Sequence, residues 1–555
     1  MQTLRQLGES GGSMRRVTSG LVALALLAGA ACAPSNPGKS ATRPQAEYLV
    51  FYAQGKQSQA LEAVADAGGA TVGQDSRLGY VLAKGAGDAF VNDLGASQAI
   101  VGVSPDRSIG FAAGGRATGS RGFPDASSFK DDSPAEPLAG RQWDMRMIGA
   151  DRAHAKAPGT KQVLVGVIDT GIDGKHPDIA PNFNRQLSRN FVTDRPKDEY
   201  GETLDGPCEA AGCKDPIDED DDGHGTHVAS TIASPINGIG IAGVAPGVQL
   251  VNIRAGQDSG FFFLKPSLDA LTYAADIGVD VVNMSYFVDP WLFNCKSNKS
   301  DTKKQQLEQQ AVITGMQRAL DYARGKGVTI ISALGNGSTD LGAPKVDKAS
   351  PGYPRGDEKT RQVDNSCINV PAESDGVISV SAVGPSGRKA IYSDYGIEQT
   401  DLAAPGGDVL DGVDAKVTRS ILAAAPEHVL RATGRIDSSG KPKGADVVQD
   451  CERGACSYYQ YLDGTSMAAP HATGVAAILI SRFGKPGPGG LALAPATVED
   501  LLYKSADRRS CPSPRGYVYK SYGQSVTHDC QGEQSRNGFY GHGIVDAWKA
   551  ATFEP

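Results

Sequence analysis

Three short segments of the sequence carry an aspartate, a histidine and a serine, which together can activate a hydroxyl for nucleophilic attack. Ser466 follows a glycine turn and opens an alanine-rich run that predicts a helix, so its hydroxyl is expected where a helix N-terminus favours negative charge. His224 lies in the run 222–229, Asp-Gly-His-Gly-Thr-His-Val-Ala, and opens a predicted helix of small residues. Asp169 directly follows the apolar run 163–168. An aspartate can fix the tautomer of a histidine, and the neutral imidazole can then take the serine proton.

The elements that must position these residues are predicted to be buried parallel strands and the helices that follow them. The apolar run 163–168 is typical of a strand buried on both faces of a sheet, and Asp169 comes at its carboxyl end, where open α/β sheets place their sites. The run 327–333 has the same character and leads into Leu-Gly-Asn-Gly at 334–337. We therefore expect an α/β fold with a site at the carboxyl ends of its strands.

The three motifs and their chain order resemble the subtilisin-like serine peptidases, the subtilase family, over residues 142–551. The resemblance implies a parallel sheet flanked by helices and a serine endopeptidase with Asp169, His224 and Ser466 as its catalytic triad. It also implies that Asn336 donates its side-chain amide to the oxyanion, with the backbone N–H of Ser466 as second donor. Taken singly, each residue has a plainer interpretation as a turn or core residue, and a catalytically silent surface binding protein on this fold is the alternative function.

The substrate cleft departs from the family pattern. The resemblance implies that Ser285, at the end of the run 281–285, and Gly335 line the cleft. The family usually continues Leu-Gly-Gly after this strand, whereas this sequence continues Tyr-Phe-Val at 286–288. Either the cleft is narrowed by these side chains or the segment bends away, so substrate preference does not transfer from the family.

The resemblance further implies a structural calcium site, while catalysis itself is expected to need no cofactor. The segment 234–241 aligns without a gap on the family's calcium loop, and ligation by oxygen alone suits Ca²⁺. The implied ligands are the side-chain oxygen of Asn237, the carbonyls of Pro235, Ile239 and Ile241, and the matching residues Asp178 and Gln142. The alternative is a plain turn.

Two other patterns only imitate metal sites. His224 and His227 are three residues apart but lack the His-Glu-x-x-His pattern of zinc peptidases. The acidic run 215–222 begins like a calcium loop, yet the twelfth position counted from Asp218 is Ala229 where a glutamate is needed. We interpret the acidic run as a solvated loop.

The beginning of the chain predicts export. Two arginines at 15–16 precede the apolar run 21–31, which is shorter than the roughly 20 residues that span a bilayer. The run ends at Cys32 in a sequence that resembles a bacterial lipobox, although glycine stands where leucine is usual three residues earlier. We expect a lipoprotein signal peptide at 1–31 with Cys32 lipidated, a tether at 32–47, and a cell-envelope protein. An ordinary signal peptide is the alternative.

Between tether and peptidase, residues 48–112 predict a small α+β domain. Strands near 48–52, 79–82 and 100–103 alternate with helices in a βαββαβ-like order that resembles the subtilase propeptide, a folding assistant and inhibitor. An accessory binding domain is the alternative. The following residues are rich in Gly, Ser, Pro and Asp, so we expect an exposed linker with the maturation cleavage at 113–137 and the peptidase domain at 138–555.

Cysteine usage and charge complete the expectations. Of nine cysteines, eight remain if Cys32 carries lipid, which allows four disulfides in an oxidising compartment. Spacing suggests the pairs Cys208–Cys213, Cys451–Cys456, Cys511–Cys530 and Cys295–Cys367, one of 105 possible sets.

The formal charge of −8 provides no basic footprint for nucleic acid. The expected partners are protein or peptide substrates, the chain's own propeptide, and a membrane through the lipid anchor before maturation releases the enzyme.

Overall fold

The computed structural model describes residues 46–106, 111–112, 136–198, 200–288, 290–412, 414–452, 455–521 and 524–554. The predicted signal peptide, Cys32 and most of the predicted linker therefore lie outside the described residues. The described residues all belong to one compact unit, Pro44–Pro555. Among their helices, none combines the length and the apolar character that crossing a membrane requires.

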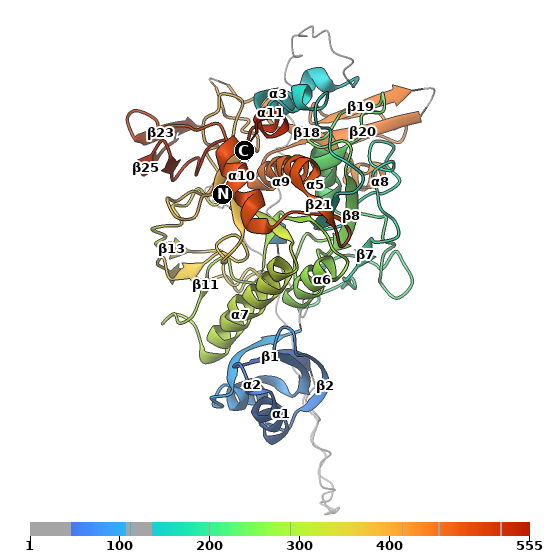
Figure 1. Cartoon of the computed structure of the whole chain (residues 1–555). Helices are drawn as coiled ribbons and strands as arrows, with labels where there is room; N and C mark the ends of the chain where they lie inside the picture. Colours follow the sequence, from blue (N-terminus) through green and yellow to red (C-terminus); the bar gives the residue numbers. More distant parts are fainter. Residues whose placement is uncertain are drawn as a thin grey trace, which may run out of the picture. The chain divides into compact units, whose positions relative to one another are not determined.

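A sheet of seven parallel strands forms the centre of the fold (Figure 1). Its order is β17-β16-β12-β9-β6-β8-β7, and every neighbouring pair runs parallel. The strands are β6 (Leu164–Ile168), β7 (Arg189–Asn190), β8 (Gln249–Arg254), β9 (Val281–Met284), β12 (Thr329–Ala333), β16 (Ile378–Val383) and β17 (Leu402–Pro405). All five residues of β6 are buried, which confirms the strand predicted before Asp169. The α/β fold predicted from the sequence is confirmed.

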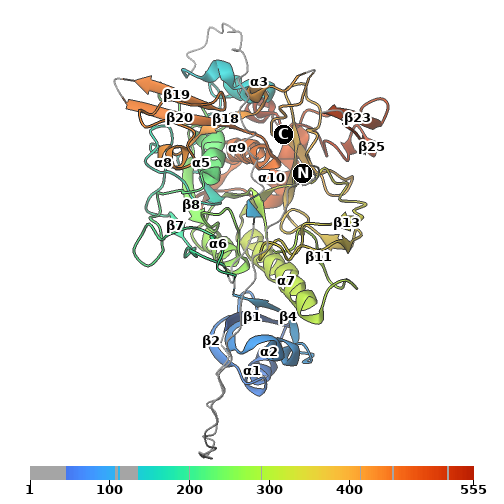
Figure 2. The ribbon, with the colours of Figure 1, turned by 180° about the vertical axis from the view of Figure 1, so that it is seen from behind.

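Helices cover both faces of this sheet (Figures 1 and 2). Helices α5 (His224–Ala233) and α9 (Thr465–Phe483) share a core with Val165 and Val167 of β6. Helices α6 (Leu264–Asp276) and α7 (Lys303–Gly325) share another with Leu164 and Ile168 of the same strand. Successive side chains of a strand point to opposite faces, so one apolar run supplies both cores.

The N-terminal unit is a four-stranded antiparallel sheet with two helices. Its elements are β1 (Ala46–Tyr52), α1 (Gln57–Asp66), β2 (Ala70–Asp75), β3 (Tyr80–Gly85), α2 (Gly87–Leu94) and β4 (Ile100–Pro105). The predicted βαββαβ order is present, and β2 is the strand for which the sequence offered no range. β2 is largely exposed at the sheet edge, and its register with β3 shifts between Thr71 and Gly73. The sequence therefore lacks the apolar run that would predict a buried strand here.

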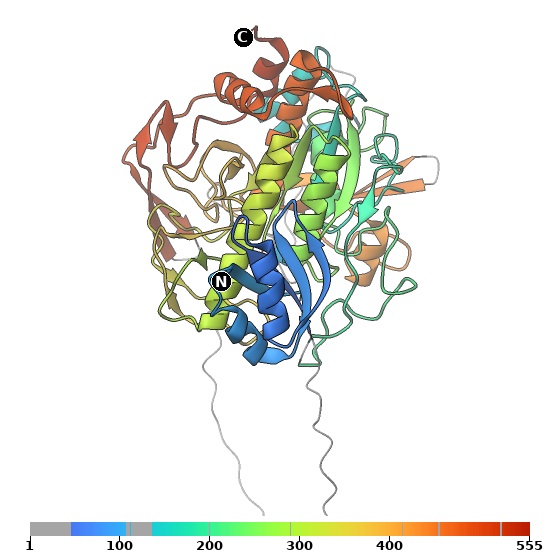
Figure 3. The same cartoon turned by 60° about the horizontal axis from the view of Figure 1, so that its bottom comes forward.

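This unit packs on α7, where Figure 3 shows it in blue. Phe51 of β1 lies against Gly315, and a Cβ added there would come within 2.6 Å of the phenyl ring. The guanidinium of Arg318 donates to the carbonyls of Tyr52 and Gly79, at 2.9 and 3.0 Å. α7 therefore packs against the central sheet on one side and against the N-terminal unit on the other.

The other elements belong neither to the central sheet nor to the N-terminal unit. A three-stranded antiparallel sheet and a helix fill the long excursion between β17 and α9: β18 (Ile421–Ala424), α8 (Glu427–Ala432), β19 (Val447–Glu452) and β20 (Ala455–Leu462). The remaining helices are η1 (Ala139–Arg141), α3 (Trp143–Met147), α4 (Ala150–Ala153), η2 (Val417–Arg419), α10 (Pro495–Ser505) and α11 (Ala547–Thr552). The remaining paired strands are β5 (Phe111–Ala112) with β10 (Tyr286–Phe287), β11 (Asn294–Cys295) with β15 (Cys367–Ile368), β13 (Val346–Asp347) with β14 (Arg361–Gln362), β21 (Lys485–Gly487) with β22 (Gly490–Ala492), β23 (Gly516–Ser521) with β24 (Gln524–Asp529), and β25 (Gly532–Glu533) with β26 (Arg536–Asn537).

Four disulfides join the cysteine pairs that the spacing suggested. They are Cys208–Cys213, Cys295–Cys367, Cys451–Cys456 and Cys511–Cys530. Three of these disulfides close short loops, with sequence separations of 5 to 19 residues. The fourth, Cys295–Cys367, joins β11 to β15 across a sequence separation of 72 residues. The predicted disulfide set is thus confirmed.

Candidate active site

Asp169 and His224 meet at the carboxyl end of β6. Asp169 is fully buried, and its Oδ1 accepts a hydrogen bond from Nδ1 of His224 at 2.7 Å. The backbone N–H of Thr170 donates to the same oxygen at 2.8 Å. Because Asp169 holds Nδ1, the proton is directed to that nitrogen and Nε2 is left as the basic position of the ring. Nε2 is buried and has no hydrogen-bond partner among the described residues.

His224 is brought to this point by a glycine turn and a helix of small residues. It is the first residue of α5, and Gly223 before it adopts a left-handed φ of +96°, which favours glycine. Gly225 allows the helix to approach, because a Cβ there would overlap the carbonyl oxygen of Gly171 and lie 3.0 Å from the Cβ of Asp169. The His-Gly sequence is therefore required by the close approach of α5 to the end of β6.

The pKa of His224 results from two opposing effects. Burial by itself would lower it, but the negative charge of Asp169 and its hydrogen bond outweigh burial and raise the pKa to about 9. Asp222 and Asp220 raise it further in the same direction. Asp169 thus stabilises the imidazolium. This is the form that a histidine takes after it accepts a proton from a hydroxyl as a general base.

Ser466 lies in the first turn of α9, which packs against α5. Its side chain is fully buried, and Oγ donates to the carbonyl of Ser285 at 3.2 Å. In return Oγ of Ser285 donates to the carbonyl of Ser466 at 3.0 Å. These reciprocal bonds fix the start of α9 to the end of β9, so the predicted cleft residue Ser285 lies directly beside the predicted nucleophile.

Asn336 follows β12 and faces the same helix start. Its Oδ1 accepts two hydrogen bonds from Thr465, one from the backbone N–H and one from the hydroxyl, both at 2.9 Å. Oγ1 of Thr465 also accepts from the backbone N–H of Gly335 at 3.1 Å. With Oδ1 engaged, the side chain of Asn336 presents its NH₂ group as the donor, next to the first turn of α9, where the helix dipole favours negative charge.

The cleft strand continues past Ser285 as β10, which pairs antiparallel with β5 of the same chain. Phe287 is opposite Phe111 and Tyr286 is opposite Ala112. The ring of Tyr286 is only 1 % exposed and stacks on Phe262 with a centroid distance of 4.0 Å. Its ring is therefore packed into the core, and the edge of this strand pairs with the backbone of β5. The buried ring of Tyr286 therefore does not narrow the cleft, and residues 286–287 are paired as a strand.

The residues expected to bind calcium converge near the end of α5. Asp178 is fully buried and accepts hydrogen bonds from the backbone N–H of Ile241, the Asn237 amide and the Tyr459 hydroxyl, at 3.0, 3.3 and 3.1 Å. Gln142 exchanges two hydrogen bonds with the backbone of Ala242.

The donor chemistry of this cluster fits a cation. No described basic side chain pairs with Asp178, and burial raises its pKa to about 8. The carbonyl oxygens of Pro235, Ile239 and Ile241 accept no hydrogen bond from a described residue. A buried carboxylate without a counter-charge beside unused carbonyl oxygens is the environment that an oxygen-ligated ion compensates.

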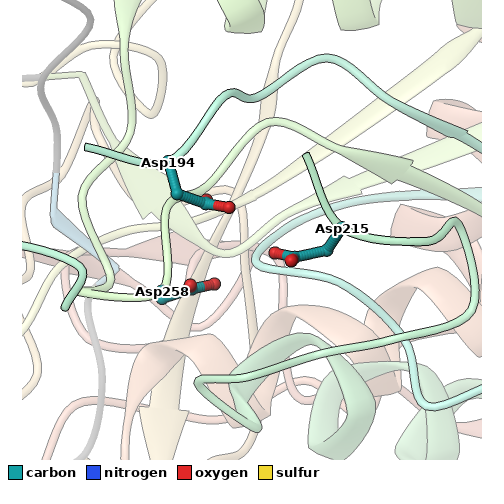
Figure 4. A group of neighbouring side chains, drawn as sticks. All are labelled: Asp194, Asp215 and Asp258. Atoms are coloured by element: carbon teal, nitrogen blue, oxygen red, sulfur yellow. The ribbon is translucent and has the colours of Figure 1, made fainter. Parts of the chain in front are cut away.

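The acidic run 215–222 is not the solvated loop that the sequence suggested. Asp215, Asp218 and Asp220 are 4, 6 and 0 % exposed. Asp215 joins Asp194 and Asp258, whose carboxylates face one another in Figure 4. Their counter-charge is the guanidinium of Arg254 in β8, which is 2.8 Å from Asp215 and 3.3 Å from Asp194 and also pairs with Asp258.

Asp220 links the two loops that carry Asp169 and His224. Its Oδ1 accepts from the hydroxyl of Thr170 at 2.9 Å, and its Oδ2 accepts from the backbone N–H of Thr226 at the same distance. The sequence reasoning missed this carboxylate and also Thr465, the partner of Asn336. Their position beside the motifs was the one available signal, since Thr465 directly precedes Ser466 and Asp220 lies two residues before the run 222–229.

Comparison with known proteins gives a consistent assignment. The family model described as "Peptidase_S8: Subtilase family" matches residues 160–543. A thermophilic serine proteinase from Bacillus sp. (strain AK1) is 27 % identical over 344 residues, 62 % of this chain and 58 % of that protein. Subtilisin DY from Bacillus licheniformis is 26 % identical over 337 residues, covering 61 % of this chain and 83 % of that protein. The chain thus spans little more than half of the first relative's length.

A solved structure shows the same fold over most of the chain. The epidermin leader peptide processing serine protease from Staphylococcus aureus superposes with a TM-score of 0.59 at 22 % sequence identity. The superposition covers 92 % of this chain and 98 % of that one. At this identity the likeness concerns the arrangement of the elements, and it extends beyond the residues that the family model matches.

Proposed function

The chain belongs to the subtilase family, and from this membership we propose that it is a serine endopeptidase whose nucleophile is Ser466. The observation that carries the proposal is the 2.7 Å hydrogen bond between Asp169 and His224 on α5, which packs against α9. The buried Nε2 of His224 has no hydrogen-bond partner among the described residues. The reaction is hydrolysis of a peptide bond by way of an acyl-enzyme.

Each residue has one role in this reaction. Oγ of Ser466 attacks the peptide carbonyl while Nε2 of His224 takes its proton, and Asp169 stabilises the imidazolium that forms. The carbonyl oxygen becomes an oxyanion, which accepts hydrogen bonds from the Asn336 amide and the Ser466 backbone N–H. The imidazolium then gives its proton to the leaving amine, and water hydrolyses the ester by the same steps in reverse order.

The N-terminal unit is proposed to keep the enzyme inactive as a zymogen. The pairing of β5 with β10 supports this, because the backbone of Phe111 and Ala112 uses the strand edge beside Ser285 that an extended substrate would need. We propose that residues 48–112 act as an inhibitory propeptide and that self-cleavage takes place in the linker 113–137, shortly after Ala112.

We further propose that the precursor is exported and held in the bacterial cell envelope. The signal peptide would be residues 1–31, and the lipid would be attached to Cys32 at the start of the tether 32–47. Four disulfides within the folded unit suit an oxidising compartment. Because the lipid and the peptidase are on opposite sides of the linker, cleavage there would release a soluble enzyme once the propeptide is degraded.

The rival function is a catalytically silent surface binding protein on the same fold. A fluorophosphonate probe separates the two, because it reacts covalently only with a serine that a base activates. We expect mature wild-type protein to be labelled and Ser466→Ala to remain unlabelled. Ser505→Ala removes another buried serine hydroxyl, on α10, and should label as wild type does. Absence of labelling in mature wild type would favour the binding protein.

We also propose a structural calcium ion, held by Asp178, Asn237 and the carbonyls described above. Bound calcium supplies positive charge to the buried carboxylate and joins the loop 234–241 to the residues around it. An ion bound only by the native state stabilises the fold by about 2.7 kcal/mol when its free concentration is a hundred times Kd.

Chelation is therefore expected to lower the unfolding temperature, measured on Ser466→Ala protein to prevent autolysis. Adding Asp178→Asn should abolish this sensitivity, because the anionic ligand is lost. Adding Asp280→Asn instead alters a buried carboxylate that accepts from Leu164 N–H, and should leave the sensitivity intact. Equal melting curves with and without chelator in the Ser466→Ala protein would exclude the ion.

A further inference from the structure

The loop that carries Asn336 rests on the side chain of Asp394. Asp394 is 3 % exposed, and its Oδ1 accepts a hydrogen bond from the backbone N–H of Thr339 at 2.7 Å. The N–H of Gly337 donates to the same carboxylate. In the opposite direction, the backbone N–H of Asp394 donates to the carbonyl of Gly335 at 2.9 Å. Asp394 thus holds the chain on both sides of Asn336.

The glycines around Asn336 are explained by this contact. Gly335 has a left-handed φ of +128°, and a Cβ on it would overlap Oδ2 of Asp394. A Cβ on Gly337 would lie 3.1 Å from Oδ1 of the same carboxylate. The Gly-Asn-Gly sequence therefore leaves the space in which the carboxylate reaches the backbone N–H groups of the loop.

The carboxylate is available in its charged form at neutral pH. Burial raises the pKa of Asp394, to about 6, but the hydrogen bonds from Thr339 and Gly337 and the nearby charge of Lys389 limit the rise. Lys389 is itself held by the carbonyls of Ala390 and Ser393, at 2.9 and 2.7 Å. An ionised carboxylate accepts backbone N–H groups more strongly than a neutral amide does.

Asn336 is consequently held from two directions. Thr465, at the start of α9, fixes its side chain through Oδ1, and Asp394 fixes the backbone on which that side chain stands. An oxyanion donor is effective only when it is already in place as charge develops, since reorientation during the reaction would reduce its benefit. A shift of the loop by a fraction of an ångström would move the amide away from the oxyanion.

We propose that Asp394 is a positioning residue for the oxyanion donor Asn336, acting on kcat through the loop and without touching substrate. This inference rests on the proposed function, in which Asn336 stabilises the oxyanion.

A double-mutant cycle with Asn336 tests the inference. In mature enzyme, with concentration set by fluorophosphonate titration, Asn336→Ala should lower kcat by about 10²–10³. Asp394→Asn should lower kcat by about tenfold with KM within about twofold of wild type. In the Asn336→Ala background, Asp394→Asn should change kcat by less than about twofold, because the donor that it positions is gone.

Two further variants keep the test decisive. Asp280→Asn makes the same chemical change at a buried carboxylate that accepts from the N–H of Leu164, the first residue of β6, and it should leave kcat unchanged. If Asp394→Asn does not fold, Gly337→Ala replaces it, since its Cβ crowds the carboxylate while Asp394 is retained. Its effect on kcat should likewise disappear in the Asn336→Ala background.

The outcomes separate this inference from the proposed function. A full tenfold loss in both backgrounds would show that the loop variant acts elsewhere and would overturn the positioning role. A kcat for Asp394→Asn equal to that of Asp280→Asn would do the same. If mature wild type hydrolysed no peptide, the proposed function itself would be overturned. If Asn336→Ala kept the kcat of wild type, Asn336 would not be the oxyanion donor.

Discussion

Ser466→Ala is expected to lower kcat about a millionfold, to the residual rate that substrate binding and the oxyanion donors provide. The variant should also remain an unprocessed precursor, because the hydroxyl that would cut the linker is missing. To measure kcat on a processed chain, the variant is cleaved in trans by tagged wild type, which is then removed. Ser505→Ala, which alters a buried hydroxyl on α10, should retain wild-type kcat and processing.

The same pair of proteins tests maturation and release. Mature wild type should begin within the linker, shortly after Ala112, and part of it should be found in the soluble fraction of expressing cells. The Ser466→Ala precursor should remain wholly with membranes, since the multiple acyl chains of a bacterial lipoprotein hold firmly where one chain would not. Normal turnover in Ser466→Ala would refute the nucleophile, and equal partitioning of both proteins would refute release by self-cleavage.

Asp169→Asn is expected to lower kcat about 10⁴-fold while the fold persists. The asparagine keeps a polar group beside Nδ1 of His224, but it favours the wrong tautomer and no longer stabilises the imidazolium. Asp280→Asn is the matched control, a buried carboxylate beyond the opposite end of β6, and should leave kcat unchanged. A loss below about tenfold in Asp169→Asn would contradict the assigned role.

The pH dependence provides a second measure of the same contact. Catalysis needs neutral His224, whose pKa is raised to about 9 by Asp169 against the effect of burial. Wild-type kcat/KM should therefore rise with pH and reach half its plateau near pH 9, since protonated His224 cannot take the serine proton. In Asp169→Asn the stabilising charge is gone and burial favours the neutral ring, so the midpoint should move to lower pH. An unchanged midpoint would show that Asp169 does not set this pKa.

The sequence by itself determined the fold class and the residues that could carry out chemistry. Buried parallel strands are continuous apolar runs, so 163–168 identified β6 and placed Asp169 at its end. His224 and Ser466 were recognisable because each lies in a short motif whose glycines and small residues allow close packing. These signals are local, and a local signal can be read without knowing what packs against it.

Contacts between distant segments were decided only by the tertiary structure. The acidic run 215–222 was interpreted as solvated because consecutive carboxylates are costly to bury without a counter-charge. Arg254 of β8 supplies that charge and makes burial of Asp215 favourable. The pairing of β10 with β5 depends on a segment more than 170 residues earlier in the chain, which no motif at 286–288 could indicate.

Asp394 illustrates the same limit at the site itself. It is 58 residues from Asn336, in a stretch without a recognised motif, so the glycines at 335 and 337 suggested only a turn. The fold brings its carboxylate under the loop and thereby explains both glycines. Sequence patterns report what a segment needs locally, whereas the burial of a charge depends on partners that only the folded chain brings within hydrogen-bonding distance.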